Sequence, residues 1–229
     1  MFVRQLFDRD TSTYTYIIAD EKTSEAAIID PVKEQFERDV LLLNQLGFKL
    51  KYVLETHVHA DHITSSGHLR EKFSAQVALH ENSGAKCADL LLKDGDVLKL
   101  GDIEVKAIHT PGHTNADLSF AAEGYVFTGD ALLVRDCGRT DFQLGDSATL
   151  YHSINEKIFS LGDATVIYPG HDYYGFTAST VKEEKLYNNR LGNGKTEDEF
   201  VEIMANLDLA LPKRIKESVP GNTNCGLVH

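Results

Sequence analysis

The chain has 229 residues, of which 42% are hydrophobic and 25% are charged, as in ordinary globular proteins. This length is sufficient to bury a large core, and it predicts a single domain over residues 1–229. The formal net charge of -12 at pH 7 repels polyanions. We therefore expect neither nucleic acid nor an anionic membrane surface as a partner.

The N-terminus and the cysteines bear on location. Residues 1–9 alternate charged and apolar residues and lack the apolar core of a secretory signal. No stretch approaches the roughly eighteen apolar residues of a membrane-spanning helix. Cys87, Cys137 and Cys225 are odd in number and have no CxxC spacing, which predicts a reducing compartment without a disulfide framework. The predicted location is the cytoplasm.

The first third of the chain predicts a sheet covered by a helix. Runs of β-branched and aromatic residues at 2–7, 14–19 and 26–30 are typical of strands, and Pro31 ends the third. An amphipathic helix follows, and Gly47 is its expected C-terminal cap.

Strands and helices then alternate, which indicates an α/β (α+β) fold. Residues 52–55 form the next expected strand, and residues 63–73 the next helix, with Ile63, Leu69 and Phe73 on one face. The glycine- and proline-rich end of the chain is expected to be a loop. The remaining predicted elements are strands at 76–80, 97–100, 103–109, 117–122, 125–128 and 165–168, helices at 150–161, 180–187 and 196–209, and the loop at 218–229.

Four potential metal ligands lie in the turn between the strand at 52–55 and the helix that follows. They are His57, His59, Asp61 and His62. Imidazoles and a carboxylate suit zinc, iron or manganese, and a turn lets such side chains converge. A lone histidine is usually structural, whereas this density predicts a metal site.

Three further polar residues follow predicted strands directly after a glycine. They are His113, Asp130 and His171. Each by itself is typical of an ordinary turn. As a set they are expected to converge with the histidine-rich turn at one sheet edge, because strand-end loops present functional groups there.

The HxHxDH motif at 57–62, followed by Gly-His, Gly-Asp and Gly-His, resembles the metallo-β-lactamase superfamily over about residues 14–171. This resemblance implies an αββα sandwich of two facing mixed sheets flanked by helices, with a short helical and loop extension from about residue 180. It also implies two ligand groups. They are His57, His59, His113 and Asp130 for the first metal, and Asp61, His62 and His171 for a second.

Four stretches resemble the persulfide (sulfur) dioxygenase branch of that superfamily, and they are 55–64, 136–143, 168–173 and 188–190. Asn189 departs from the branch pattern, in which proline precedes the arginine. The branch implies one Fe(II) per chain, bound by His57, His113 and Asp130. The remaining ligand-type residues would either orient this centre or hold a second metal, and they are His59, Asp61, His62 and His171.

The resemblance implies an enzyme that oxidises glutathione persulfide with O2 and water to sulfite and glutathione. Arg139 and Arg190 would clamp substrate carboxylates, and Tyr173 would donate a hydrogen bond. Arg139, Tyr173 and His171 are the expected catalytic groups. Cys137 either lines the substrate pocket or is a small buried filler.

Two other functions compete with this interpretation. A glyoxalase II-like hydrolase of glutathione thioesters would use two metals, but the block at 137–141 and the short tail after His171 argue against it. A binding protein that keeps the ligand set as a relic is the other. A homodimer and a functional link to a rhodanese-type sulfurtransferase remain open.

Overall fold

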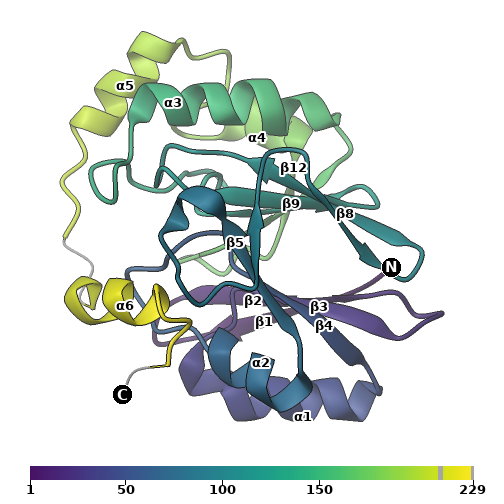
Figure 1. Cartoon of the computed structure of the whole chain (residues 1–229). Coiled ribbons are helices and arrows are strands. Elements are labelled where there is room, and N and C mark those ends of the chain that lie inside the picture. Colours follow the sequence, from purple (N-terminus) through teal and green to yellow (C-terminus); the bar gives the residue numbers. More distant parts are fainter. Residues whose placement is uncertain (211–213, 228–229) are drawn as a thin grey trace.

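The computed structural model describes residues 1–210 and 214–227. Two six-stranded sheets face each other between outer layers of helices (Figure 1). This arrangement confirms the predicted αββα sandwich.

The first sheet comes from the N-terminal part of the chain. Its first three strands pair antiparallel and the next three pairings are parallel, so the sheet is mixed. In spatial order the strands are β1 (Phe2–Asp8), β2 (Thr13–Ala19), β3 (Glu25–Ile29), β4 (Lys49–Leu54), β5 (Gln76–His80) and β6 (Leu90–Leu92).

The second sheet is antiparallel except where the neighbouring strands β10 and β11 run parallel. In spatial order its strands are β12 (Ser179–Thr180), β11 (Val166–Pro169), β10 (Tyr125–Gly129), β9 (Leu118–Ala122), β8 (Ile103–His109) and β7 (Val97–Leu100).

Helices cover the outer face of each sheet (Figure 1). The first sheet carries α1 (Phe36–Leu46) and α2 (Ser66–Phe73), and α6 (Ile215–Asn222) lies beside the sandwich. The second carries α3 (Ser147–His152), α4 (Val181–Tyr187) and α5 (Glu197–Ala205). Short helical turns complete the set, and they are η1 (Lys33–Gln35), η2 (Glu81–Ser83), η3 (Ser153–Ile158) and η4 (Phe159–Leu161). None of the helices in residues 1–210 and 214–227 could cross a membrane.

The main core lies between the sheets. Tyr16, Leu100, Phe120 and Phe127 are fully buried there. Alternate residues of the same strands, such as Ile17, face the other way and pack with α1 and α2. Burial of each large apolar side chain contributes roughly 1.5–3 kcal/mol to stability. The core therefore holds both sheets rigidly and fixes the loops at their edges.

Two predicted boundaries are wrong, and two short strands were not predicted. Ile63 is buried but precedes α2, because the backbone N–H groups of Thr64 and Ser65 are bonded to other segments instead of a helix. α5 ends at Ala205, and the predicted stop at 211–212 lies outside the described residues. The short strands β6 and β12 carry no period of their own and were not predicted.

The end of the chain also differs from the prediction. The segment expected to be a loop from residue 218 contains most of α6, with Pro220 inside the helix. Its packing against the body of the protein overrides the poor helix propensity of Pro220, Gly221 and Asn222. Residues 228–229 of the predicted loop lie outside the described residues.

The expectation that the cysteines stay unpaired is wrong as well. Cys87 and Cys225 form a disulfide, although 138 residues separate them in sequence. The sequence gives no spacing signal for this pair because the fold alone brings the two residues together. Cys137 is free and buried.

Candidate metal centre

The residues of the HxHxDH motif lie in a loop that follows β4, and we call residues 55–65 the metal loop. Its start is fixed by Asp30, which follows β3. The Asp30 carboxylate accepts hydrogen bonds from the Thr56 backbone N–H at 2.7 Å and from the Thr56 hydroxyl at 2.8 Å. The Leu118 N–H donates to the Thr56 carbonyl at 2.7 Å and ties the loop to the second sheet.

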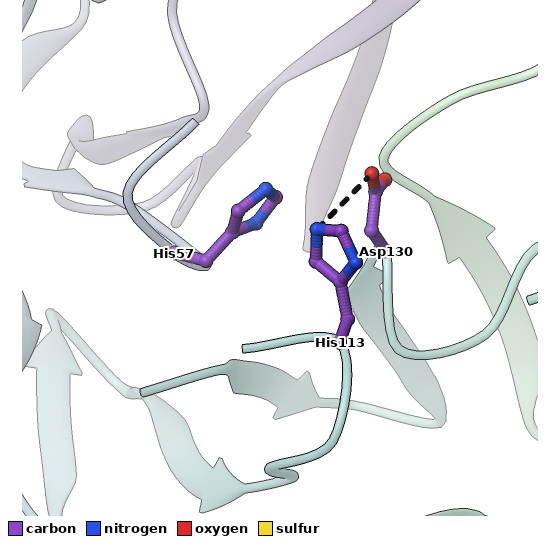
Figure 2. A group of neighbouring side chains, drawn as sticks. All are labelled: His57, His113 and Asp130. Atoms are coloured by element: carbon purple, nitrogen blue, oxygen red, sulfur yellow. Dashed lines mark ion pairs between the residues drawn. The ribbon is translucent and has the colours of Figure 1, made fainter. Parts of the chain in front are cut away.

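Three residues from three different loops meet at the edge of the two sheets. His57 comes from the metal loop, His113 from the β8–β9 connection and Asp130 from the end of β10. One ligand atom of each lies within 4.8 Å of the others. Figure 2 shows the two rings and the carboxylate around a common space, with His113 Nε2 at 3.8 Å from Asp130 Oδ2.

Each of these three side chains is oriented by a second contact. The Thr56 hydroxyl donates to Asp30, so His57 Nδ1–H must donate to that hydroxyl, at 3.0 Å. His113 Nδ1–H donates to the Arg139 carbonyl at 2.7 Å. Both Nε2 atoms are therefore left as acceptors, which is the form in which a neutral imidazole binds a metal.

The electrostatics of the group suit a cation. Burial, with the neighbouring His59 and His113, holds the pKa of His57 well below its ordinary value, so the imidazole is neutral. Burial by itself would raise the pKa of Asp130, but His171 and the other imidazoles hold it below its usual range. The carboxylate is therefore ionised.

Glycines next to the ligands make room for this packing. A Cβ on Gly129, whose φ is +52°, would lie 2.5 Å from the Thr56 hydroxyl oxygen. A Cβ on Gly170 would lie 2.6 Å from Asp130 Oδ1. The Gly-Asp and Gly-His pairs thus reflect close backbone approach at the site.

His171 bridges two carboxylates. Its Nδ1 lies 2.6 Å from Asp130 Oδ1 and its Nε2 lies 3.0 Å from Asp61 Oδ2. Asp61 also contacts His62 Nδ1 at 2.9 Å, and the Thr13 hydroxyl lies 3.1 Å from His171 Nε2. Burial lowers the pKa of His171, but the two carboxylates outweigh it and raise that pKa well above its ordinary value.

The His59 ring lies 4.0 Å from the His57 ring, measured between their centroids, but it faces two carboxylates outside the motif. It is buried, and its Nε2 lies 3.2 Å from Asp30 Oδ1 and 3.3 Å from Glu55 Oε2. Among the described residues, neither ring nitrogen of His59 has a partner in full hydrogen-bond geometry, so its contacts with the two carboxylates are ion-pair contacts. The ligand atoms of His59, Asp61 and His62 also lie within 4.8 Å of one another. The structure thus places the predicted residues in two adjacent groups.

The donor set fits a mononuclear metal ion. His57, His113 and Asp130 offer two imidazole nitrogens and one carboxylate oxygen, each from a side chain oriented by a second contact. Two histidines and one carboxylate, with open positions, form the arrangement typical of non-haem Fe(II) oxygenases.

A cavity of about 460 Å³ lies over this group. The proposed substrate residues lie in its lining, and they are Cys137, Arg139, Tyr173 and Arg190. Both guanidinium groups already have partners. Arg139 Nε and Nη2 donate to Asp141 at 2.7 and 2.8 Å, and Arg190 Nε lies 2.6 Å from Asp136. Tyr173 is 68% exposed, so it stands at the rim.

Cys137 behaves as a buried filler as well as a lining residue. Its sulfur lies 3.8 Å from the Met204 sulfur, and burial raises the pKa of its thiol to about 12. It is therefore a neutral thiol at physiological pH, without the reactivity of a thiolate.

Sequence reasoning named His171 as a residue that could orient the centre, but it did not predict the other residues that hold the metal loop. Thr56, Gln143 and Asn222 hold the metal loop, and the Gln143 side chain donates to the Val58 carbonyl at 2.7 Å. Asp30 was a missed signal, because a carboxylate at a strand end before Pro31 has the same placement as Asp130. Asn222 gave no local signal.

Comparison with known proteins agrees with this geometry. The model of the Metallo-beta-lactamase superfamily matches residues 8–171. The chain is 46% identical to human "Persulfide dioxygenase ETHE1, mitochondrial" over 230 residues, which cover 99% of this chain and 89% of the human one. The mouse protein of the same name is 45% identical over the same shares. The crystal structure of ETHE1 from Myxococcus xanthus superposes with a TM-score of 0.96 at 49% identity, covering 99% of this chain and 100% of that one.

Proposed function

Because this chain belongs to the metallo-beta-lactamase superfamily and aligns along 99% of its length with persulfide dioxygenases, we infer that it is a persulfide dioxygenase, an oxidoreductase. The observation that carries this inference is the group of His57, His113 and Asp130 at the base of the cavity. The reaction we propose oxidises glutathione persulfide with O2 and water to sulfite and glutathione.

We propose one Fe(II) per chain, bound by His57 Nε2, His113 Nε2 and Asp130. Iron in this position would supply the activation of dioxygen that side chains cannot provide. Thr56 and the Arg139 carbonyl keep the two histidine rings in the tautomer with a free Nε2. His171 keeps Asp130 in place through its 2.6 Å contact.

The cavity suits an anionic thiol compound. Arg139 and Arg190 would meet the glutathione carboxylates, and their present partners Asp141 and Asp136 occupy the same forks. A glutathione carboxylate could therefore take the place of Asp141 on Arg139, or of Asp136 on Arg190. Each guanidinium would then have a carboxylate partner before and after the substrate binds. Tyr173 at the rim would donate a hydrogen bond to the glutathione part, and Cys137 would line the cavity beside the substrate.

A second candidate function is the dinuclear hydrolase of glutathione thioesters. The observation that favours it is the group of His59, Asp61 and His62, which could hold a further metal. Against it, both ring nitrogens of His171 already face carboxylates, and His59 Nε2 lies between Asp30 and Glu55. We therefore propose that His59, Asp61, His62 and His171 orient the iron ligands instead of binding a second metal.

The decisive experiment is anaerobic purification with metal analysis, followed by oxygen uptake on glutathione persulfide. We expect about one iron per chain and O2 consumption matched by sulfite. Two metals per chain, thioester hydrolysis and no O2 uptake would refute the proposal in favour of the hydrolase. Metal binding without turnover of either substrate would indicate a binding protein.

We also propose that residues 1–229 form one domain. Its partners would be small molecules and not nucleic acid. A homodimer and a rhodanese-type sulfurtransferase are the macromolecular associations to test.

A cytoplasmic location remains a prediction. Its cysteine argument is weakened by the Cys87–Cys225 disulfide, and the human, mouse and bovine relatives carry the word "mitochondrial" in their names.

A further inference from the structure

The C-terminal segment, residues 215–227, packs directly on the metal loop and the start of α2. The Cys225 carbonyl accepts from the Gly67 N–H at 2.9 Å, and the Thr223 carbonyl accepts from the Lys86 N–H at 3.2 Å. A Cβ on Gly226 would lie 1.9 Å from the Thr64 carbonyl oxygen. This close approach means that the segment and the loop cannot move independently.

Asn222 makes the contact that reaches the metal loop itself. It is 4% exposed, and its side-chain oxygen accepts from the Thr64 N–H at 2.9 Å. Its amide nitrogen donates to the His59 carbonyl and to the His62 carbonyl, both at 2.8 Å. The amide thus uses one acceptor and two donors on three points of the loop, a pattern that neither a carboxylate nor an apolar side chain can reproduce.

The contacts of the loop divide it into two halves. Asp30 and Leu118 fix the half before His57. Asn222 bonds to the half from His59 to Thr64. The segment after β3 also contacts this half, because the Lys33 N–H donates to the Ile63 carbonyl at 2.8 Å. That second half carries Asp61, which with Asp130 holds the His171 ring from both sides. Asn222 therefore acts on the iron ligand Asp130 through the backbone of the loop and through His171.

A covalent bond holds Asn222 in its place. Cys225 lies three residues after it and is joined to Cys87, which lies between η2 and β6. The Cys225 side chain is 1% exposed, whereas Cys87 is only partly buried. Cys87 is therefore the more exposed end of the disulfide, and it is the side from which a small thiol would approach the bond.

We propose that Asn222 is a positioning residue for the metal centre and that the Cys87–Cys225 disulfide makes this positioning dependent on thiol redox state. The reductant is a low-molecular-weight thiol of the glutathione class, which is also the product of the proposed reaction. Its thiolate attacks the Cys87 sulfur, and the Cys225 thiolate leaves and takes a proton. A second thiol then releases the Cys87 thiol, so one disulfide is reduced while two thiols become one small disulfide. The effect on iron rests on the proposed metal centre, whereas the disulfide chemistry does not.

The test measures metal release without turnover, so it is separate from the dioxygenase assay. Protein loaded with Fe(II), and protein loaded with Co(II) as a spectroscopic probe, is mixed with a chromogenic chelator. We expect Asn222→Asp to release either metal about 10–100-fold faster than the wild-type protein, the range seen when a residue supporting a ligand is removed. We also expect a changed visible spectrum of the Co(II) form.

The control is Asn224→Asp, because Asn224 is exposed and, within residues 1–210 and 214–227, its side chain bonds only to the Pro220 carbonyl of its own segment. This variant should release metal within about twofold of the wild-type rate. Treating wild-type protein with glutathione should speed release in the same direction, while a Cys87→Ala, Cys225→Ala variant should release fast with or without glutathione.

The proposal is overturned if Asn222→Asp keeps the wild-type release rate and Co(II) spectrum. It is also overturned if glutathione reduces the disulfide of the wild-type protein and leaves release unchanged. The glutathione arm needs no substitution, so it decides the matter even if the Asn222 variant fails to fold. If the chain bound metal but did not oxidise persulfides, these release rates would still differ, and the two failures can be told apart.

Discussion

Removing the hydroxyl of Thr56 should test how much the orientation of the His57 ring matters, because the histidine itself stays in place. In Thr56→Val the shape is kept, but His57 Nδ1–H loses its acceptor and Asp30 Oδ2 loses its donor. Thr56 is 1% exposed, so water cannot replace either bond. At about 1–2 kcal/mol for each of the two bonds, the free energy of unfolding should fall by about 2–4 kcal/mol.

The larger effect is expected on the metal. With Nδ1 unconstrained, the ring can rotate or adopt the other tautomer, and iron affinity should fall about 10–100-fold, or roughly 1.4–2.7 kcal/mol. Chelator competition measures the affinity, and urea unfolding measures the stability. Thr56→Ser keeps the hydroxyl and is the control. If Thr56→Val bound iron as tightly as Thr56→Ser, the idea that this hydroxyl fixes the His57 tautomer would be wrong.

Three further outcomes are expected. Arg139→Lys should raise KM for glutathione persulfide about tenfold with little change in kcat. Lysine lacks the two-pronged guanidinium that now binds both oxygens of Asp141 and would bind a substrate carboxylate. If oxygen-uptake assays gave an unchanged KM, Arg139 would not be a carboxylate clamp. Burial and neighbouring His109 lower the pKa of His80 from 6.5 to about 4, so wild-type stability should fall as pH drops from about 6.5 to 4. In urea unfolding, the fall in stability between pH 6.5 and 4 should be smaller in His80→Gln than in the wild-type protein. It should be unchanged in the control variant His152→Gln, because His152 is exposed. Phe127→Ala, which opens the core between the sheets, should cost about 3–5 kcal/mol in the same assay, and a cost below about 1 kcal/mol would contradict the packing described.

The strands and the ligand residues could be predicted because their signals are local. Runs of β-branched and aromatic residues such as 14–19 correspond to β2, and the Gly-Asp pair at 129–130 marks the end of β10. The supporting contacts could not be predicted, because they join residues far apart in sequence. Asn222 and His59 are 163 positions apart, and no spacing rule relates them.

The C-terminal region illustrates the same limit. Pro220 and Gly221 favour a loop by local propensity, yet the segment is helical where Cys225 and Asn222 anchor it. Propensity differences of about 1–3 kcal/mol for glycine or proline can be outweighed by a disulfide and several buried hydrogen bonds. The cysteine prediction failed for the same reason, since spacing along the chain carries no information on pairing through the fold.

The metal loop shows why ligand-type residues alone do not decide the number of metals. His57 and His59 are two positions apart, but their contacts differ. His57 faces a hydroxyl that fixes one nitrogen and frees the other, while His59 Nε2 lies between the carboxylates of Asp30 and Glu55. Burial opposes charge on His59, but those carboxylates outweigh it and raise the pKa of His59 well above its ordinary value, which favours the imidazolium over a metal ligand. The carboxylates of Asp30 and Glu55, which lie outside the HxHxDH motif, are what distinguish the supporting residue His59 from the ligand His57 in this loop.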